Sequence, residues 1–188
     1  MKTYNLFPNY LIEDKAELTS EIVSSLKNDI DEVKNSALYE ETTYGWTSNR
    51  KTGLPQNSLK SLSLLAGNYF SKDIRKLFDT RNLNIDIIEP YLISIKPGAY
   101  YPLDVNIRRW FNGCIWLQTS NKGSHLYFKD FNARQFLGPD CVDREFYASP
   151  VKHKMCFWPS NVPSGFTTNK SQIDNIIMCF TFRAPVKI

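Results

Sequence analysis

Two histidines are the side chains of this chain best suited to acid–base or metal chemistry near neutral pH. His125 and His153 stand apart, and neither has a second histidine or a carboxylate at the spacing of a metal-binding pair. The chain also lacks a glycine-rich phosphate loop, a Gly-x-Ser-x-Gly turn and a cysteine placed beside a histidine at a helix start. We therefore expect both histidines to be surface residues or core residues with satisfied hydrogen bonds.

The cysteines predict buried thiols rather than disulfides. They form no Cys-x-x-Cys pair, and Cys114, Cys156 and Cys179 each stand inside an apolar run. This usage is typical of small apolar side chains buried in a protein that stays in a reducing environment. Disulfides among these residues and Cys141 are the less favoured alternative.

The first 80 residues are expected to form two helices that cover a sheet. Glu13–Val33 carries one apolar stripe with spacings of four, four, four and three residues, as in an amphipathic helix. The stripe consists of Leu18, Ile22, Leu26, Ile30 and Val33. A second helix is expected from an N-cap at Ser58 to about Phe78. Leu6–Leu11 is predicted to be an edge strand, because its proline has no N–H to donate, and Asn35–Gln56 is rich in turn residues.

The pattern changes at Ile85, where short apolar, β-branched and aromatic runs alternate with Gly, Pro, Asn and Asp. The expected strands are Ile85–Ile95, Gly113–Gln118, His125–Lys129, Arg144–Ala148, Lys152–Trp158 and Asn175–Arg183. Short strands after two helices indicate an α+β chain with a jelly-roll-like core and helices on one face. We predict a single domain, residues 1–188, with a helical cover over 1–80 and a jelly-roll core over 84–188.

Four fragments of the chain resemble motifs of one enzyme family. The fragments are KPGAYYPLDVN (Lys96–Asn106), NGCIWLQ (Asn112–Gln118), GSHLYFKD (Gly123–Asp130) and MCFWPSNVPSGFTTN (Met155–Asn169). In order and spacing they resemble the prolyl-hydroxylase-like branch of the 2-oxoglutarate/Fe(II) oxygenases, in particular a subgroup common in tailed phages. GWTSN at Gly45–Asn49 is similar to an N-terminal signature of that subgroup. The resemblance implies a double-stranded β-helix, a cupin-like jelly roll with two N-terminal helices packed on one sheet.

Members of this family bind Fe(II) with two histidines and one carboxylate, and two of these ligands alternate on one strand. The resemblance places the first two ligand positions on Asp104 and Asn106 and the distal histidine position on Ser164. One carboxylate, one amide and one hydroxyl are a poor set for Fe(II), which favours imidazole alongside carboxylate. We therefore expect these positions to be vestigial and to hold no metal.

The family also pairs the distal carboxylate of 2-oxoglutarate with a basic side chain on a late strand. That position falls near Asp174 or Asn175, and Arg183 lies well beyond it. The sequence therefore predicts no metal, no cofactor and no catalysis. An oxygen-only site for Mg²⁺ or Ca²⁺ at the vestigial positions is disfavoured by the low number of carboxylates.

Composition excludes several other classes of protein. Hydrophobic residues make up 42% and charged residues 22% of the 188 residues, as in an ordinary globular protein. The net charge of +4 is scattered, and Arg108–Arg109 is the only arginine pair, so we expect no dedicated nucleic-acid surface. We find no signal peptide and no run that reaches the ~18 apolar residues of a membrane helix, so neither secretion nor a membrane partner is expected.

The favoured hypothesis is an oxygenase-like jelly roll that has lost catalysis and serves as a structural or protein-binding module. The likeness to phage sequences makes it, more specifically, a virion component such as a neck, tail, baseplate or decoration protein. Its partners would then be other virion proteins or copies of itself; without a phage origin, a cytoplasmic location is expected. One alternative is an active 2-oxoglutarate/Fe(II) hydroxylase with a non-standard metal site. The other is a carbohydrate-binding module in which Trp110, Trp116 or Trp158 stacks on sugar.

Overall fold

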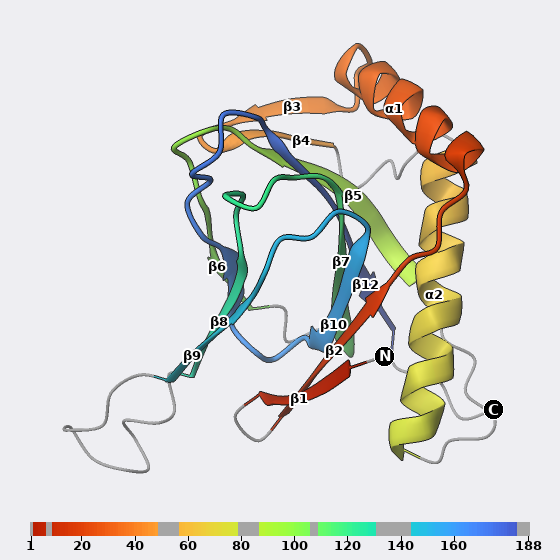
Figure 1. Cartoon of the computed structure of the whole chain (residues 1–188), viewed down its shortest axis with the longest axis vertical. Coiled ribbons are helices and arrows are strands. Elements are labelled where there is room, and N and C mark those ends of the chain that lie inside the picture. Colours follow the sequence, from red (N-terminus) through yellow and green to blue (C-terminus); the bar gives the residue numbers. More distant parts are fainter. Residues whose placement is uncertain are drawn as a thin grey trace.

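A computed structural model describes residues 2–6, 9–48, 57–78, 87–105, 109–130 and 144–183. These ranges hold two helices and two antiparallel sheets (Figure 1). The larger sheet has the order β1 (Lys2–Leu6), β2 (Asn9–Lys15), β10 (Lys154–Pro159), β7 (Phe111–Gln118), β12 (Asn175–Phe182), β5 (Ile87–Ile95), β4 (Gly45–Ser48) and β3 (Tyr39–Thr42). The smaller sheet has the order β6 (Tyr101–Asp104), β11 (Ser164–Phe166), β8 (Leu126–Asp130) and β9 (Arg144–Ala148).

Both helices lie on the side of the larger sheet that faces away from the smaller sheet (Figure 1). They are α1 (Ser20–Lys34) and α2 (Asn57–Phe78). The arrangement confirms the predicted α+β jelly roll with two N-terminal helices packed on one sheet. No helix among the residues that the structure describes is long and apolar enough to cross a membrane.

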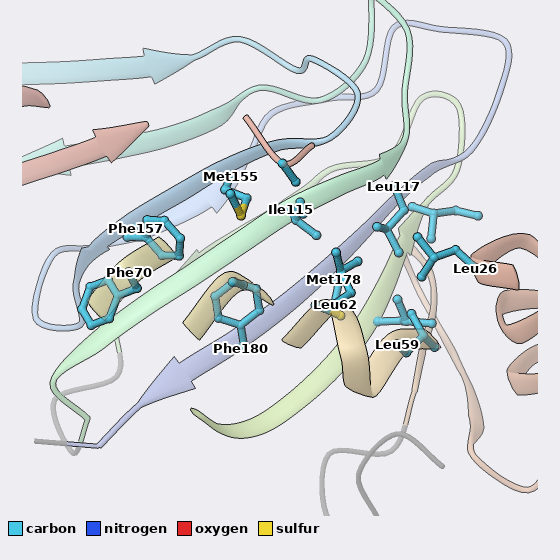
Figure 2. Close-up of a cluster of buried hydrophobic side chains, with 14 of the residues drawn as sticks. Leu26, Leu59, Leu62, Phe70, Ile115, Leu117, Met155, Phe157, Met178 and Phe180 are labelled. Atoms are coloured by element: carbon cyan, nitrogen blue, oxygen red, sulfur yellow. The ribbon is translucent and has the colours of Figure 1, made fainter. Parts of the chain in front are cut away.

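The outer core fills the space between the helices and the larger sheet (Figure 2). Its helical members include Leu26, Ile30, Val33, Leu59, Leu62 and Phe70, and its sheet members include Ile115, Met155, Phe157, Met178, Phe180 and Phe182. Phe70 is fully buried and stacks on Phe182, with 4.0 Å between the ring centroids. Burying one such side chain contributes about 1.5–3 kcal/mol, so this layer supplies much of the driving force for folding.

The inner core lies between the two sheets, and strand alternation separates it from the outer core. On β7, Ile115 and Leu117 point toward the helices, whereas Cys114 and Trp116 point toward the smaller sheet. From the smaller sheet, buried side chains of β8 and β11 meet them. The inner core includes Leu11, Ile93, Ile95, Cys114, Trp116, Leu126, Phe128, Cys156, Trp158, Phe166, Ile177 and Cys179.

The first helix is shorter than its apolar stripe predicted. Helix α1 begins at Ser20, after Thr19, whose Oγ1 accepts a hydrogen bond from the backbone N–H of Ile22 at 3.3 Å. The segment Glu13–Lys15, expected to be helical, belongs to β2 instead, because it pairs with β10. The second helix begins at Asn57, one residue before the predicted cap, and ends at Phe78 as expected.

The first 80 residues also contain four strands, so they form more than a helical cover. The predicted single strand at Leu6–Leu11 is a hairpin of β1 and β2, and β1 is the edge of the sheet. Part of the segment expected to be only turn-rich forms the hairpin of β3 and β4, which pairs with β5. Gly45 makes this pairing possible, because a Cβ there would lie 2.3 Å from the carbonyl oxygen of Ser94.

The six strands expected after Ile85 are all present, with ends that differ by at most two residues. They are β5, β7, β8, β9, β10 and β12. Two short strands, β6 and β11, were not expected, because three or four residues give little alternation to read. These two strands carry two of the three predicted ligand positions.

Candidate functional site

The vestigial ligand positions meet where β6 pairs with β11. Asp104 lies directly opposite Ser164, and Tyr101 lies opposite Phe166, with a register shift between the two pairs. Three residues of β6 therefore span two residues of β11, which is the geometry of a β-bulge. In a regular strand Tyr101 and Asp104 would point to opposite faces. The bulge lets both residues share the face of Ser164, which points toward the larger sheet.

Asp104 and Ser164 line a small cavity at the mouth of the jelly roll. Its volume is about 50 Å³, and both sheets contribute to its wall. Residues of the larger sheet that line it include Glu89, Tyr91, Asn112, Cys179 and Thr181. Small-molecule sites usually measure roughly 300–1,000 Å³. The cavity therefore has room for a few water molecules but not for a cosubstrate of the size of 2-oxoglutarate.

The hydroxyl of Ser164 already has a partner. It accepts a hydrogen bond from the indole N–H of Trp158 at 3.0 Å, and the serine is 8% exposed. Asp104 is exposed, and its Oδ1 accepts a hydrogen bond from the backbone N–H of Val105 at 2.8 Å. The third predicted position, Asn106, lies outside the described residues.

An ion pair stands at the rim of the same cavity. Glu89 accepts a hydrogen bond from the guanidinium of Arg109, and Glu89 has a backbone φ of 52°. The side chain of Arg109 is only 28% exposed. Arg109 thus pairs with a residue that lines the cavity. No local sequence pattern indicates this pair, because its members lie 20 residues apart.

The late position that binds the 2-oxoglutarate carboxylate in the family is occupied by acidic and neutral groups. The carboxylate of Asp174 accepts a hydrogen bond from the hydroxyl of Ser94 at 3.3 Å. Asn175 is fully buried, and its Oδ1 accepts a hydrogen bond from Oγ1 of Thr119 at 2.9 Å. Arg183, at the far end of β12, is exposed. The carboxylate of Asp174 would repel a dicarboxylate, and the amide of Asn175 carries no charge that would attract one.

Both histidines are half-buried and lie away from the cavity. Burial lowers the pKa of His125, and Lys154 and Lys170 lower it further. Burial also lowers the pKa of His153, with smaller contributions from Lys152 and Lys15. Both imidazoles are therefore neutral at physiological pH. Within the described parts of the chain, no group of three or more His, Cys, Asp or Glu residues is arranged to hold a metal ion.

Three cysteines form a row across the inner face of the larger sheet. Cys114 on β7 lies opposite Cys156 on β10 and opposite Cys179 on β12. All three are buried free thiols, as predicted, and Cys141 lies outside the described residues. Burial raises the pKa of Cys114 well above its ordinary value, and the contact with Cys156 raises it further. Cys114 is therefore a protonated, unreactive thiol.

No protein-family model and no curated protein matches the chain. Among solved structures it resembles a prolyl-4-hydroxylase from Pseudomonas putida, with 15% identity over 94% of this chain and 93% of the other and a TM-score of 0.62. A 2OG-Fe(II) oxygenase family oxidoreductase from Burkholderia pseudomallei has 11% identity over 92% and 84%, with a TM-score of 0.64. The carbocyclase SnoK from nogalamycin biosynthesis has 11% identity over 92% and 78%, with a TM-score of 0.65. The fold is that of the 2-oxoglutarate/Fe(II) oxygenases.

The residues at the ligand positions do not fit the iron of these enzymes. Fe(II) oxygenases of this kind use two imidazoles and one carboxylate on one face of the metal. Here Asp104 offers a carboxylate, whereas Ser164 offers a hydroxyl engaged by Trp158. Neither histidine lines the cavity. The described ligand positions therefore do not supply the ligand set of an iron oxygenase.

Two of the three tryptophans considered for sugar binding are unavailable for it. Trp116 is fully buried and Trp158 is 4% exposed, and both belong to the inner core. Trp110 is half-buried and packs edge-on against Phe70, with 6.0 Å between the ring centroids. The prediction that Trp116 or Trp158 stacks on a sugar is wrong, because apolar aromatics at strand spacing fill the core here.

Proposed function

We propose that this protein is a catalytically inactive member of the oxygenase fold that serves as a structural or protein-binding module. One observation supports it most: the serine at the distal histidine position is bonded to Trp158 and faces Asp104 across a cavity of about 50 Å³. Among the residues that the structure describes, the site offers no imidazole ligand, its cavity is smaller than a usual small-molecule site, and Asp174 and Asn175 occupy the late position where the family has a basic side chain. This combination fits a fold that is kept for its shape.

The specific form of this proposal is a component of a phage particle, in the neck, tail or baseplate or as a decoration protein. Its support is the resemblance of the sequence motifs to a subgroup common in tailed phages. Its partners would be other virion proteins or further copies of the chain. Mass spectrometry of purified particles from a phage that encodes the chain tests this form, and absence of the chain from the particles would contradict it.

Metal binding tests the loss of catalysis. The purified protein is reconstituted with Fe(II) without oxygen, desalted and analysed for iron, and succinate release from 2-oxoglutarate is then measured in air. We expect substoichiometric iron and no succinate above the protein-free rate. Stoichiometric iron with succinate release would overturn the proposal.

A rebuilt site sharpens this test. The triple variant Asp104→His, Asn106→Asp, Ser164→His restores the ligand types of the family at its three positions. We expect it to bind Ni²⁺ or Co²⁺ at least tenfold more tightly than the natural chain, measured by titration calorimetry. The matched control is Asp104→Ala, Asn106→Ala, Ser164→Ala, which changes the same positions without adding ligands. Equal metal affinity of the two triple variants would show that these positions are not the vestigial site.

The second candidate function is an active 2-oxoglutarate/Fe(II) oxygenase with a non-standard metal site. It is favoured by the solved structures, because those that resemble this chain over more than nine-tenths of its length include oxygenases. The iron and succinate measurements decide between the two candidates.

A further inference from the structure

A second, larger hollow lies outside the jelly roll, between α1 and the ends of β7 and β12. Its volume is about 540 Å³, within the usual range of small-molecule sites. The floor of this α1 groove is aliphatic and includes Val23, Leu26, Ile30, Leu117 and Ile176. Leu26 of α1 and Leu117 of β7 both line it, and Figure 2 shows their side chains pointing toward each other where the helix meets the sheet. The floor contains no aromatic side chain, so it offers a surface for an aliphatic chain rather than a stacking site.

The rim of the α1 groove is cationic. Lys27, Lys34 and Lys152 line it, and Asp31 is the one acidic residue in its lining. Among the residues that the structure describes, none of these lysines forms an ion pair with a carboxylate. The ammonium of Lys34 lies 5.7 Å from the centre of the Trp46 ring, which holds it near the groove. The lining therefore carries three positive charges against one negative charge.

The remaining polar groups of the lining do not change this balance. His153 is uncharged at neutral pH, because burial and Lys152 lower its pKa. Gln118 uses its side-chain amide to donate to the backbone oxygen of Asp174 at 3.0 Å, and Thr119 donates to Asn175. Neither side chain can compensate the lysines. An anion is the complementary ligand for the rim.

We propose that the α1 groove binds a single-chain aliphatic carboxylate, with its chain on the floor and its carboxylate at the lysine rim. An aliphatic chain would cover the apolar surface that the groove still exposes, chiefly at Val23 and Ile173. Its carboxylate would neutralise lysines that form no ion pair. Lysine presents a point charge on a flexible stem, which suits a carboxylate whose position varies with chain length. The site is separate from the cavity at Asp104. The proposal that it binds a carboxylate therefore does not depend on the proposed loss of catalysis.

Titration calorimetry with octanoate, decanoate and dodecanoate, each below its micelle concentration, tests the proposal on the full chain. We expect saturable binding of one molecule per chain. Each buried methylene should tighten binding by up to about fourfold, so affinity should rise along the series. Dodecanol and dodecyltrimethylammonium are the neutral and cationic probes of equal chain length. Binding of either as tightly as dodecanoate would overturn the proposal, as would non-saturable uptake.

Charge reversal at the rim separates this site from general adsorption. The variant Lys27→Glu, Lys152→Glu should bind dodecanoate at least tenfold more weakly than the natural chain. The matched control is Lys60→Glu, Lys170→Glu, which reverses two exposed lysines outside the groove and should stay within twofold. Circular dichroism confirms that both variants are folded. Equal weakening in both variants overturns the proposal.

A vesicle arm distinguishes a free carboxylate from a membrane surface. The chain is sedimented with vesicles of phosphatidylglycerol and with vesicles of phosphatidylcholine. We expect no more sedimentation with the first than with the second. Sedimentation with phosphatidylglycerol vesicles together with no calorimetric signal for dodecanoate would assign the rim to a lipid surface and overturn the proposal.

Discussion

The two faces of the larger sheet differ in the side chains that they bury. The outer face carries Phe157, Phe180 and Phe182, which pack with Phe70 of α2. The inner face carries the row of three cysteines and Trp158, whose indole donates a hydrogen bond to Ser164 of β11 in the smaller sheet. Strand alternation places the phenylalanines and the cysteines back to back on β10 and β12. The predicted ligand positions Asp104 and Ser164 lie across the inner core on the smaller sheet, whereas the residues that hold the helices lie on the outer face.

The predicted ligand positions and the aromatic layer therefore lie on opposite sides of the larger sheet. Changes at Asp104 or Ser164 leave the aromatic layer of the outer face untouched. The outer face should therefore dominate the free energy of unfolding, and the inner face should tolerate change.

Truncation of Phe70 should have the largest effect. Its ring is fully buried and contacts Trp110, Phe111, Phe157 and Phe182. Phe70→Ala should lower the free energy of unfolding by about 3–5 kcal/mol, because it leaves a cavity in the outer core. Urea titration followed by circular dichroism measures this. A loss below about 1 kcal/mol would contradict the contrast between the faces.

Adding a side chain at Gly113 should have the next largest effect on the free energy of unfolding, although the glycine itself adds no side chain to the core. A Cβ at this position would lie 2.1 Å from Cε2 of Phe180. Gly113→Ala should therefore cost about 1–3 kcal/mol by overpacking. The double variant Gly113→Ala, Phe180→Leu should lose less than the sum of its two single changes, because the smaller leucine removes the clash. Additive losses in urea titrations would argue against this clash.

The buried thiols should make stability fall at high pH. Burial raises the pKa of Cys114 in the folded state, so the folded thiol keeps a proton that the unfolded thiol loses above its ordinary pKa of about 8.5. The unfolded state then binds fewer protons, and the free energy of unfolding falls as pH rises, by at most about 1.4 kcal/mol per pH unit for one thiol. Urea midpoints between pH 8 and pH 10 measure the slope. Cys114→Ala should make the slope shallower, and an unchanged slope would exclude this thiol as its source.

The hydrogen bond between Trp158 and Ser164 should contribute the least to the free energy of unfolding. A double-mutant cycle with Trp158→Phe and Ser164→Ala should give a coupling energy of about 1 kcal/mol. The fold should survive both changes, since neither touches the outer core. A coupling near zero would show that the hydroxyl of Ser164 does not depend on the indole, and that the position is free for another ligand.

Part of the fold was predictable from the sequence because it depends on local pattern. The longer strands after residue 85 alternate strongly, and their positions were found to within two residues. The segment Glu13–Lys15 was predicted to be helical because it comes shortly before the apolar stripe that begins at Leu18. Its strand pairing with β10 involves residues about 140 positions away, which no local pattern indicates. The hairpin of β3 and β4 was missed because it is short and polar, and pairing with β5 fixes it.

The candidate site was predictable in its positions but not in its geometry. The resemblance to the oxygenases identified Asp104 and Ser164, and the structure places them opposite each other. The bulge that turns Asp104 to the inner face has no sequence signal, because it arises from pairing between two short strands. The alignment of Cys114, Cys156 and Cys179 depends on strand register, which alternation alone leaves open.

The position of β12 has a consequence for when the protein can fold. This strand comes late in the chain, yet it lies in the middle of the larger sheet, between β7 and β5. When all the earlier strands have been synthesised, β12, which joins the two halves of the sheet, is still missing. Until then, β7 and β5 each expose an unpaired edge to neighbouring chains. Folding should therefore be slow and should follow synthesis of nearly the whole described chain, a period in which chaperones would protect it.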